Sequence, residues 1–345
     1  MDKLTKRQLN ILEFIKKSGK AGNREIKEYL RNVSRITIVR DLNFLLDNGL
    51  IEQKGKGRSV FYEERTKNGF LRYIDIDRYF EKEADKRKLK FKSFNFNIFK
   101  NIKDIFTYKE LKELQGLNKQ HRARIKKLPK SALKKEFERL TIELSWKSSR
   151  IEGNTYSLID TEVLIKENKE AIGHKKEEAI MILNHKKALD YISDRRNDFK
   201  KITVLKIKSI HDLIIDRLGI ERGLRKSPVR IIGTEYLPLD NQHQIREAVG
   251  KAVRVINKLS NPFSKTFFAI VMISYIQPFI DGDKRTARLL GNALLMANNV
   301  CPLSFRSVDE AEYKKSLIIF YEQNSLRAFK ELFIEQFKFA VDNYF

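Results

Sequence analysis

Apolar residues recur at helical spacing three times within the first fifty residues of this 345-residue chain. Residues 5–18 place their apolar side chains on one face and are followed by Gly19, and residues 23–30 begin with asparagine, a common N-cap. Ser34 is a second N-cap candidate, and the third helix, which it starts, is expected to end at Gly49. The apolar face of this third helix is predicted to consist of Ile36, Val39, Leu42, Leu45 and Leu46.

An alternating pattern follows these helices from Leu50 to Tyr62, and the basic, glycine-rich stretch 54–58 (KGKGR) interrupts it. Alternation around such a stretch predicts a β-hairpin. Three short helices followed by a hairpin resemble the winged helix-turn-helix of many transcription regulators. The resemblance implies that residues 1–65 are a DNA-binding domain, with the third helix in the major groove and the hairpin as a wing beside it.

Basic and polar side chains gather on this helix and hairpin. The candidate DNA-binding residues are Arg35, Thr37, Arg40, Lys54, Lys56 and Arg58. Residues 1–65 hold 15 Lys/Arg against 9 Asp/Glu, a charge of +6, and the whole chain carries +25, which favours polyanions. Winged helices also serve as protein-interaction or dimerisation modules, and lysine-rich surfaces can be merely solvated. The concentration of basic residues on the reading helix and wing favours double-stranded DNA as the partner.

Composition changes after residue 65. Residues 66–100 combine aromatic residues with a dense charge run, which predicts a charged helical connector that packs Phe94, Phe96 and Phe99 onto the next domain. From residue 101 to 345, apolar residues recur three and four positions apart, so we expect a helical domain with one small hairpin and a mainly α protein. The longest apolar run, 267–276, is about half of a membrane span, and no signal peptide is visible; we expect a cytoplasmic protein without membrane contact.

The most informative stretch is IQPFIDGDKRTARLLGNALL, residues 276–295. One helix is expected to end near Pro278 and another to begin near Arg285, so the loop between them presents free N–H groups and the positive end of a helix dipole. Arg285 and Arg288 are three positions apart and can grip a polyphosphate from one side. Asp281 is an oxygen ligand suited to a phosphate-bound Mg²⁺. The spacing therefore predicts a site for phosphates with a metal.

This stretch resembles the signature of the Fic (Fido) family, H-P-F-x-D/E-G-N-G/K-R-x-x-R. The matching residues are Pro278, Phe279, Asp281, Gly282, Lys284, Arg285 and Arg288. Members typically transfer AMP from ATP to a hydroxyl side chain of a target protein. The resemblance implies ATP or a related nucleotide with Mg²⁺ as cofactor and Asp281 as the metal ligand. It implies a phosphate-binding set of Gly282, Asp283, Lys284, Arg285 and Arg288.

Two further segments carry the same resemblance. Residues 148–154 (SSRIEGN) resemble the family's inhibitory-helix motif through Ser148, Glu152 and Gly153. In relatives this glutamate pairs with the second arginine of the motif, here Arg288, and blocks productive seating of the γ-phosphate. Residues 223–238 resemble the family's flap hairpin, which aligns a target peptide by β-addition. The resemblance extends over about residues 95–340 and makes a protein target at the flap a further candidate partner.

The chain departs from the signature at the reacting centre. Gln277 stands where the family has its histidine, and glutamine has no titratable nitrogen that could accept the proton of a target hydroxyl. Loss of a general base typically lowers the rate by about 10²- to 10⁴-fold. Asp283 replaces the family asparagine, and we expect its charge to repel the phosphate that must approach. Efficient AMP transfer is therefore not expected.

Three hypotheses remain open from the sequence. The first is a DNA-binding regulator whose Fic domain binds nucleotide as a sensor and acts on the winged helix through the connector. The second is an enzyme that still transfers or removes AMP, with Glu152 positioning a water. The third is a structural platform for dimerisation. A homodimer is expected in any case, because paired half-sites suit winged helices.

Overall fold

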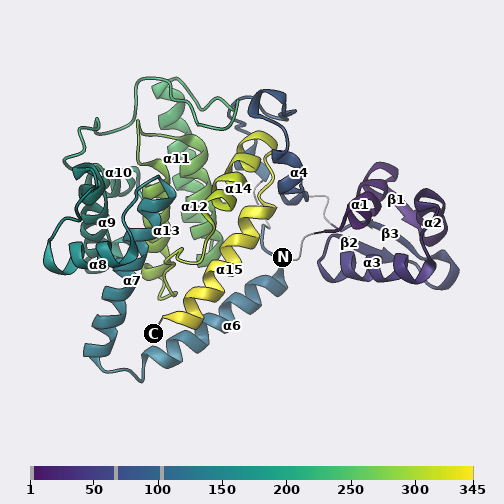
Figure 1. The fold of residues 1–345 in the computed structure, drawn as a ribbon, viewed down its shortest axis with the longest axis horizontal. Helices are drawn as coiled ribbons and strands as arrows, with labels where there is room; N and C mark the ends of the chain where they lie inside the picture. The colour runs from purple at the N-terminus through teal and green to yellow at the C-terminus, as the bar shows by residue number, and fades with distance from the viewer. Residues whose placement is uncertain (1–3, 66–68, 102–104, 345) are drawn as a thin grey trace. The chain divides into compact units, whose positions relative to one another are not determined.

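The computed structural model describes residues 4–65, 69–101 and 105–344. The chain divides into two compact units, Met1–Tyr73 and Ile74–Phe345 (Figure 1). We refer to them as the small unit and the large unit. Helices dominate both, as the sequence predicts. No described helix combines the length and the apolar character that crossing a bilayer requires.

The small unit packs three helices beside a three-stranded antiparallel sheet in the order β1-β3-β2. Its elements are α1 (Lys6–Ser18), β1 (Lys20–Gly22), α2 (Asn23–Leu30), α3 (Arg35–Asp47), β2 (Ile51–Lys54) and β3 (Phe61–Glu64). Thr5 and Ser34 cap α1 and α3 through their side chains, because each hydroxyl accepts a first-turn N–H. The hairpin pairs Lys54 with Phe61 at its open tip. The predicted helices and hairpin are therefore present, with one additional short strand, β1.

The buried face of α3 differs from the prediction. Ile38, Leu42 and Leu45 face the core, together with Asp41, whose carboxylate is paired with Arg7. Ile36 and Val39, which were expected in the apolar face, are instead 75% and 40% exposed. The prediction failed because apolar residues occur on two sides of this helix, and spacing alone does not tell which side meets α1 and the sheet.

The segment 69–101 contains less helix than the charged helical connector that its composition predicted. Its only described α-helices are α4 (Ile76–Phe80) and α5 (Ile98–Asn101), with short 3₁₀ turns between and before them. Much of its backbone is held by contacts within the large unit: Phe94 stacks on Tyr275 with ring centroids 4.6 Å apart, and Arg87 is buried. The expected packing of its aromatic residues is present. The charge run is not a solvated spacer, because one of its arginines is an anchor in the interior.

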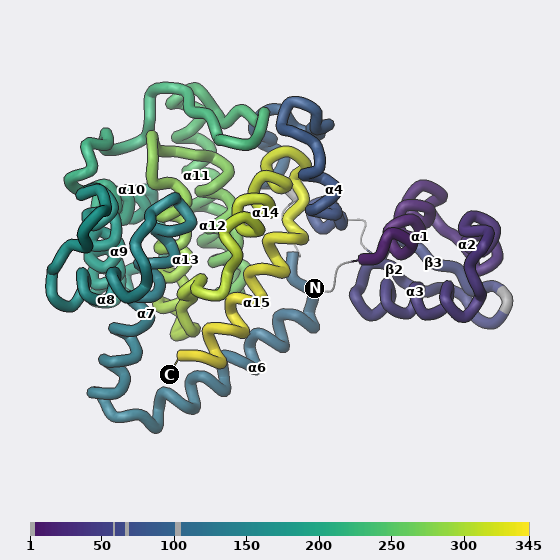
Figure 2. The backbone as a smooth tube through the Cα atoms, viewed as in Figure 1, coloured from purple at the N-terminus to yellow at the C-terminus, as the bar shows by residue number. Residues whose placement is uncertain are grey.

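The rest of the large unit is a helical assembly around α12 and α13, which pack against each other (Figures 1 and 2). Helices α7, α9 and α10 pack on α13, whereas α11 and α14 pack on α12. The bounds are α6 (Tyr108–Ile125), α7 (Lys130–Ile151), α8 (Leu158–Glu167), α9 (Lys176–Asp194), α10 (Val204–Ile214), α11 (Gln242–Lys258), α12 (Pro262–Ile276), α13 (Asp283–Ala297), α14 (Glu310–Gln323) and α15 (Arg327–Asn343). Nearly every residue of α12 and α13 is buried. The loop between them is thus held rigidly at the centre of the unit.

The hairpin expected at 223–238 is absent from this segment, all of which the structure describes. Its single β-type contact is an isolated parallel bridge between Leu237 and Ser93. Side chains satisfy the carbonyl groups instead: Arg87 donates to Gly233 O, and Gln242 donates to Leu224 O. The segment is irregular, with a turn at Ile232 and Gly233, and these long-range donors bond carbonyl groups that a hairpin would pair across its strands. We call residues 223–238 the flap segment.

Candidate nucleotide site

The loop between α12 and α13 is shaped by two left-handed residues. Gln277 ends α12 with φ 50°, and Gly282 precedes α13 with φ 85°. A Cβ on Gly282 would approach Ile214 and Ile215 to 3.3 and 3.5 Å, so glycine serves both the backbone conformation and the close packing. Because Thr286 N is the first to bond back to Gly282 O, the N–H groups of the first turn of α13 have no carbonyl partner within the helix. The structure thus contains the loop-to-helix junction that the sequence predicts, and free N–H groups at such a helix start are able to bind an anion.

Arg225, which the sequence analysis did not single out, locks this loop to the flap segment. Its guanidinium is buried and donates to three backbone carbonyls, those of Gln277 (2.6 Å), Ser227 (2.8 Å) and Leu239. Its own N–H donates to Pro278 O at 3.0 Å. Burial lowers the pKa of Arg225. A buried arginine bonded only to carbonyls could not be recognised from the sequence, because backbone carbonyls carry no residue-specific signal and one of these, that of Gln277, lies 52 positions away.

His211 supports the other side of the loop. Its ring stacks on Phe279 with centroids 3.6 Å apart and an interplanar angle of 7°. The Nε2 atom lies 2.9 Å from the carbonyl oxygen of Asp281. Burial lowers the pKa of His211, so the neutral ring donates from Nε2 at neutral pH. The histidine thereby fixes Phe279 and Asp281 without facing the loop's outer surface.

The two arginines of the motif are buried but incompletely bonded. Arg285 donates from Nη2 to Asp281 at 3.0 Å, while its Nε and Nη1 have no partner among the described residues. Arg288 donates from Nε and Nη2 to Ser148 and Glu152, and its guanidinium lies over the Tyr313 ring, 5.3 Å from the centroid; its Nη1 meets no acceptor in hydrogen-bond geometry within the described chain. Unpaired buried N–H groups are costly, and charged ones are the costliest. These three donors lie on residues within one turn of α13, and an anion that reached them would satisfy them.

Glu152, at the end of α7, forms ion pairs with two cations of the motif, Arg288 and Lys284. Its carboxylate lies 2.9 Å from Arg288 and 3.3 Å from Lys284. Burial alone would raise the pKa of Glu152, but the charges of Arg288 and Lys284 outweigh it and lower this pKa to about 2. Ser148, one turn earlier on α7, accepts from Arg288 through both its hydroxyl and its carbonyl at 2.8 Å. Gly153 follows with φ 100°, where a side chain would be strained.

The side chains at the two divergent positions are hydrogen-bonded to backbone groups of α12 and of the loop that follows it. Gln277 donates from Nε2 to Ser274 O at 2.6 Å, so its amide is bonded back to α12. Asp283 is buried and accepts from the N–H of Phe279 at 3.0 Å. Burial raises the pKa of the Asp283 carboxyl well above its ordinary value. The expected repulsion between Asp283 and a phosphate is therefore corrected: the carboxyl is turned into its own loop because it satisfies a buried N–H there.

Asp281 remains the most accessible acid of the motif. Its side chain is 62% exposed, accepts from Gly282 N at 2.6 Å and pairs with Arg285. The described residues contain no cluster of three or more His, Cys, Asp or Glu side chains arranged for a metal. One exposed carboxylate beside unpartnered arginine N–H groups fits a Mg²⁺ that phosphate oxygens and water mostly coordinate.

In the small unit, the structure distinguishes among the predicted DNA-binding residues. Arg35, Arg40 and Lys56 are exposed. Thr37 is partly buried, and its hydroxyl lies 2.9 Å from that of the capping Ser34. Lys54 is paired with Glu63 and Glu52 at 2.8 and 3.0 Å. The side chain of Arg58 lies outside the described part of the chain. Arg35, Arg40 and Lys56 are thus the exposed cations of the set for which no ion pair is seen in the described part of the chain.

Comparison with known proteins gives consistent results for the large unit. Residues 201–295 match the model of the Fic/DOC family. The chain is similar to the "Protein adenylyltransferase Fic" of Nematostella vectensis, with 26% identity over 195 residues, covering 54% of this chain and 44% of the relative. It is also similar to the protein of the same name from Aedes aegypti, with 29% identity over 191 residues, covering 53% of this chain and 37% of the relative. The chain thus spans less than half the length of these curated relatives.

Solved structures agree on the fold. The Caenorhabditis structure "Fic-1 (aa134 - 508) from C. elegans" superimposes with a TM-score of 0.57 at 21% identity, covering 68% of this chain and 70% of that chain. A Fic family protein from Desulfovibrio desulfuricans G20 gives 0.57 at 20% identity, with 69% and 74% covered. At these identities the likeness concerns the fold of the large unit.

Proposed function

Because the large unit belongs to the Fic/DOC family, we propose that it binds a nucleoside triphosphate and thereby regulates DNA binding by the small unit. The observation that carries the proposal is the set of unpartnered buried N–H groups on Arg285 and Arg288. Phosphate oxygens accept such donors in charge-assisted pairs, whereas water does so less strongly. The N-terminus of α13 adds backbone N–H groups beside them.

In this proposal, ATP binds more readily than it reacts. Gln277 has no proton acceptor of suitable basicity, and its amide is already bonded to Ser274 O. Asp281 would hold a phosphate-bound Mg²⁺, which neutralises charge on the phosphates when it is bound. Glu152 occupies Arg288 and Lys284, so it competes with the outermost phosphate for the same cations. The nucleotide then serves as an occupant of the site rather than as a group donor.

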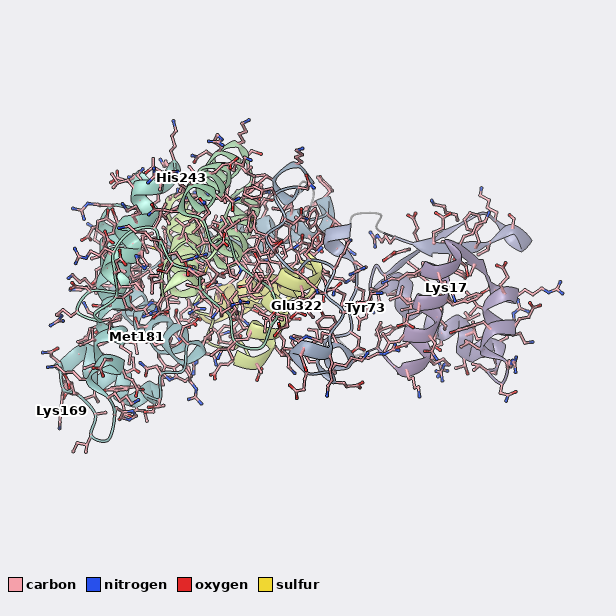
Figure 3. All side chains as sticks on the ribbon, turned by 90° about the horizontal axis from the view of Figure 1, so that it is seen from above. Lys17, Tyr73, Lys169, Met181, His243 and Glu322 are labelled. Atoms are coloured by element: carbon pink, nitrogen blue, oxygen red, sulfur yellow. The ribbon has the colours of Figure 1, made fainter. Side chains whose placement is uncertain are left out.

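A buried polar cluster supplies a route from the flap segment to the chain that leads into the small unit. Glu322, labelled in Figure 3, is fully buried in α14 and accepts from Thr234 of the flap segment at 2.6 Å. The same carboxylate accepts from Arg87 at 2.9 Å and from Tyr79 at 2.5 Å. Tyr79 and Arg87 belong to the stretch that begins directly after the small unit. Movement of the flap segment would therefore change the anchoring of this stretch.

Titration calorimetry with ATP and Mg²⁺ tests nucleotide binding. We expect binding by the wild-type chain, tighter binding by Glu152→Gly, and at least tenfold weaker binding by Arg285→Ala. Arg254→Ala, on the exposed side of α11, is the matched control and should bind as the wild type does. Absence of binding in both the wild type and Glu152→Gly would refute the nucleotide proposal.

Gel-shift titration of duplex DNA tests the regulatory half. The wild-type chain should bind duplex DNA at low salt, and its affinity for the duplex should change when ATP and Mg²⁺ are present. Arg285→Ala should retain the duplex but lose this dependence on nucleotide. If ATP leaves DNA affinity unaltered, and Arg285→Ala and Arg288→Ala behave as the wild type throughout, the large unit acts as a structural or dimerisation platform instead.

A second candidate function is AMP transfer to, or removal from, a protein hydroxyl. The names of the curated relatives favour it, since they are called protein adenylyltransferases. It requires another group to accept the hydroxyl proton, and it predicts transfer of label from ATP labelled at the α-phosphate to protein. Arg285→Ala should abolish this label. Absence of label with Glu152→Gly, despite nucleotide binding, would leave the sensor as the better account.

A further inference from the structure

The outward face of α3 combines two aliphatic side chains with two cations. Val39 and Arg40 lie three and four positions after Ile36, and Asn43 lies four and three positions after them, so these residues form one stripe along the helix, and Arg35 precedes them. All five are exposed, and none of them is acidic. The acid at Asp41 faces inward, where Arg7 and Gln8 bond it.

Neither helix formation nor core packing accounts for Ile36 and Val39. Both are β-branched, and such residues lose side-chain freedom in a helix. Neither is buried, since the core contacts of α3 come from Ile38, Leu42 and Leu45. Exposed β-branched residues here therefore favour a partner that covers them. Two aliphatic side chains make too small a patch for a stable protein interface, and the flanking arginines favour a polyanion.

The chemistry of the stripe matches the floor of a DNA major groove. Aliphatic side chains contact the 5-methyl group of thymine, an asparagine can bond an adenine edge in two places, and an arginine can bond guanine or phosphate. Ile36 and Val39 lie in the first two turns of α3, the part of a reading helix that reaches base edges. We propose that Ile36 and Val39 determine specificity by contacting thymine methyl groups, so that the preferred duplex carries thymine at defined positions.

This inference rests on the proposed DNA binding by the small unit, and the test separates the two. Duplexes that the full chain retains are selected from a library with a randomised 20-base-pair centre, and the enriched duplex is then resynthesised with deoxyuridine replacing single thymines. Uracil pairs as thymine does and lacks only the methyl group. We expect about fourfold weaker binding for each contacted methyl that is removed, the effect of losing one buried CH₂ group.

Variants then assign the methyl contacts to residues. Ile36→Ala and Val39→Ala should each weaken binding to the thymine duplex about fourfold or more and lose the thymine-to-uracil difference at one position. Arg40→Ala should weaken binding to both duplexes equally if it contacts phosphate. Leu205→Ala, an exposed aliphatic position on α10, is the matched control and should change nothing. Alanine is a better helix former, so these variants should fold.

The outcomes divide clearly. Loss of the thymine-to-uracil difference in Ile36→Ala or Val39→Ala supports the inference. Equal affinity of the wild-type chain for thymine and uracil duplexes, or selection without an enriched sequence, overturns it while leaving DNA binding intact. A stripe that serves self-association would instead show a change of molecular mass in Ile36→Ala with the thymine preference unaltered, which also overturns it. Failure to retain any duplex at low salt refutes the DNA-binding proposal itself.

Discussion

The guanidinium of Arg87 lies 2.9 Å from the carboxylate of Glu322, although 235 positions separate them, and both side chains are buried. The same carboxylate accepts hydrogen bonds from the hydroxyl groups of Thr234 in the flap segment and Tyr79 in α4. A single buried anion thus ties together α14, the flap segment and the stretch next to the small unit. The stability of this arrangement depends on every partner being present.

Arg87→Met is expected to destabilise the large unit by about 3–5 kcal/mol, because Glu322 would remain buried without its cation. Urea unfolding, followed by helical circular dichroism, measures the free energy of unfolding. The double variant Arg87→Met/Glu322→Met should regain part of this loss, since it removes both charges. If the single variant unfolds as the wild type does, Glu322 does not depend on Arg87.

Glu152 should make the stability of the chain depend on pH at the acid end. Its pKa falls from an ordinary value of 4.5 to about 2 in the folded chain. A lowered pKa means that the ionised carboxylate stabilises the fold above pH 4.5, and this contribution of roughly 3 kcal/mol is lost as the pH falls toward 2. Glu152→Gln should lack this contribution, and Glu167→Gln, on exposed surface, is the control. Parallel stability curves for the wild type and Glu152→Gln between pH 5 and 2 would contradict the assignment.

Asp283 should make stability depend on pH in the opposite direction from Glu152. Burial raises its pKa well above 3.8, so folding holds a proton that the unfolded chain releases. The contribution of Asp283 to the free energy of unfolding therefore decreases as the pH rises above 3.8. Asp283→Asn keeps an oxygen for the N–H of Phe279 and removes the ionisable group. We expect this variant to unfold at a higher temperature than the wild type at neutral pH. The difference in unfolding temperature should disappear near pH 3. An equal difference at neutral pH and at pH 3 would exclude a buried, protonated Asp283 as its cause.

Gln277→His should restore a proton acceptor at the reacting centre. Histidine tolerates the left-handed backbone better than most residues, so the substitution should preserve the loop at φ 50°. Combined with Glu152→Gly, which releases Arg288, it should raise labelling from ATP labelled at the α-phosphate by about 10²- to 10⁴-fold over Glu152→Gly alone. Gln277→Asn is the control, because it also fits the backbone but has no basic nitrogen. Absence of label in the histidine variant despite nucleotide binding would show that more than a base is missing.

The sequence by itself determined the parts of this protein that depend on neighbours along the chain. The cap at Ser34 and the loop from Gln277 to Arg285 follow from interactions within three or four positions, so they could be read from residue order. The same stretch carries the signature of the Fic family, which the family match over residues 201–295 confirms, and the solved structures agree on the fold.

Only the tertiary structure decided which partner each side chain finds across the fold. It turned Ile36 and Val39 outward, bonded Asp283 to Phe279, joined Arg87 to Glu322 and left the flap segment without a hairpin. The reason is physical: burial and long-range hydrogen bonding depend on which elements pack together, and periodicity within one helix does not contain that information.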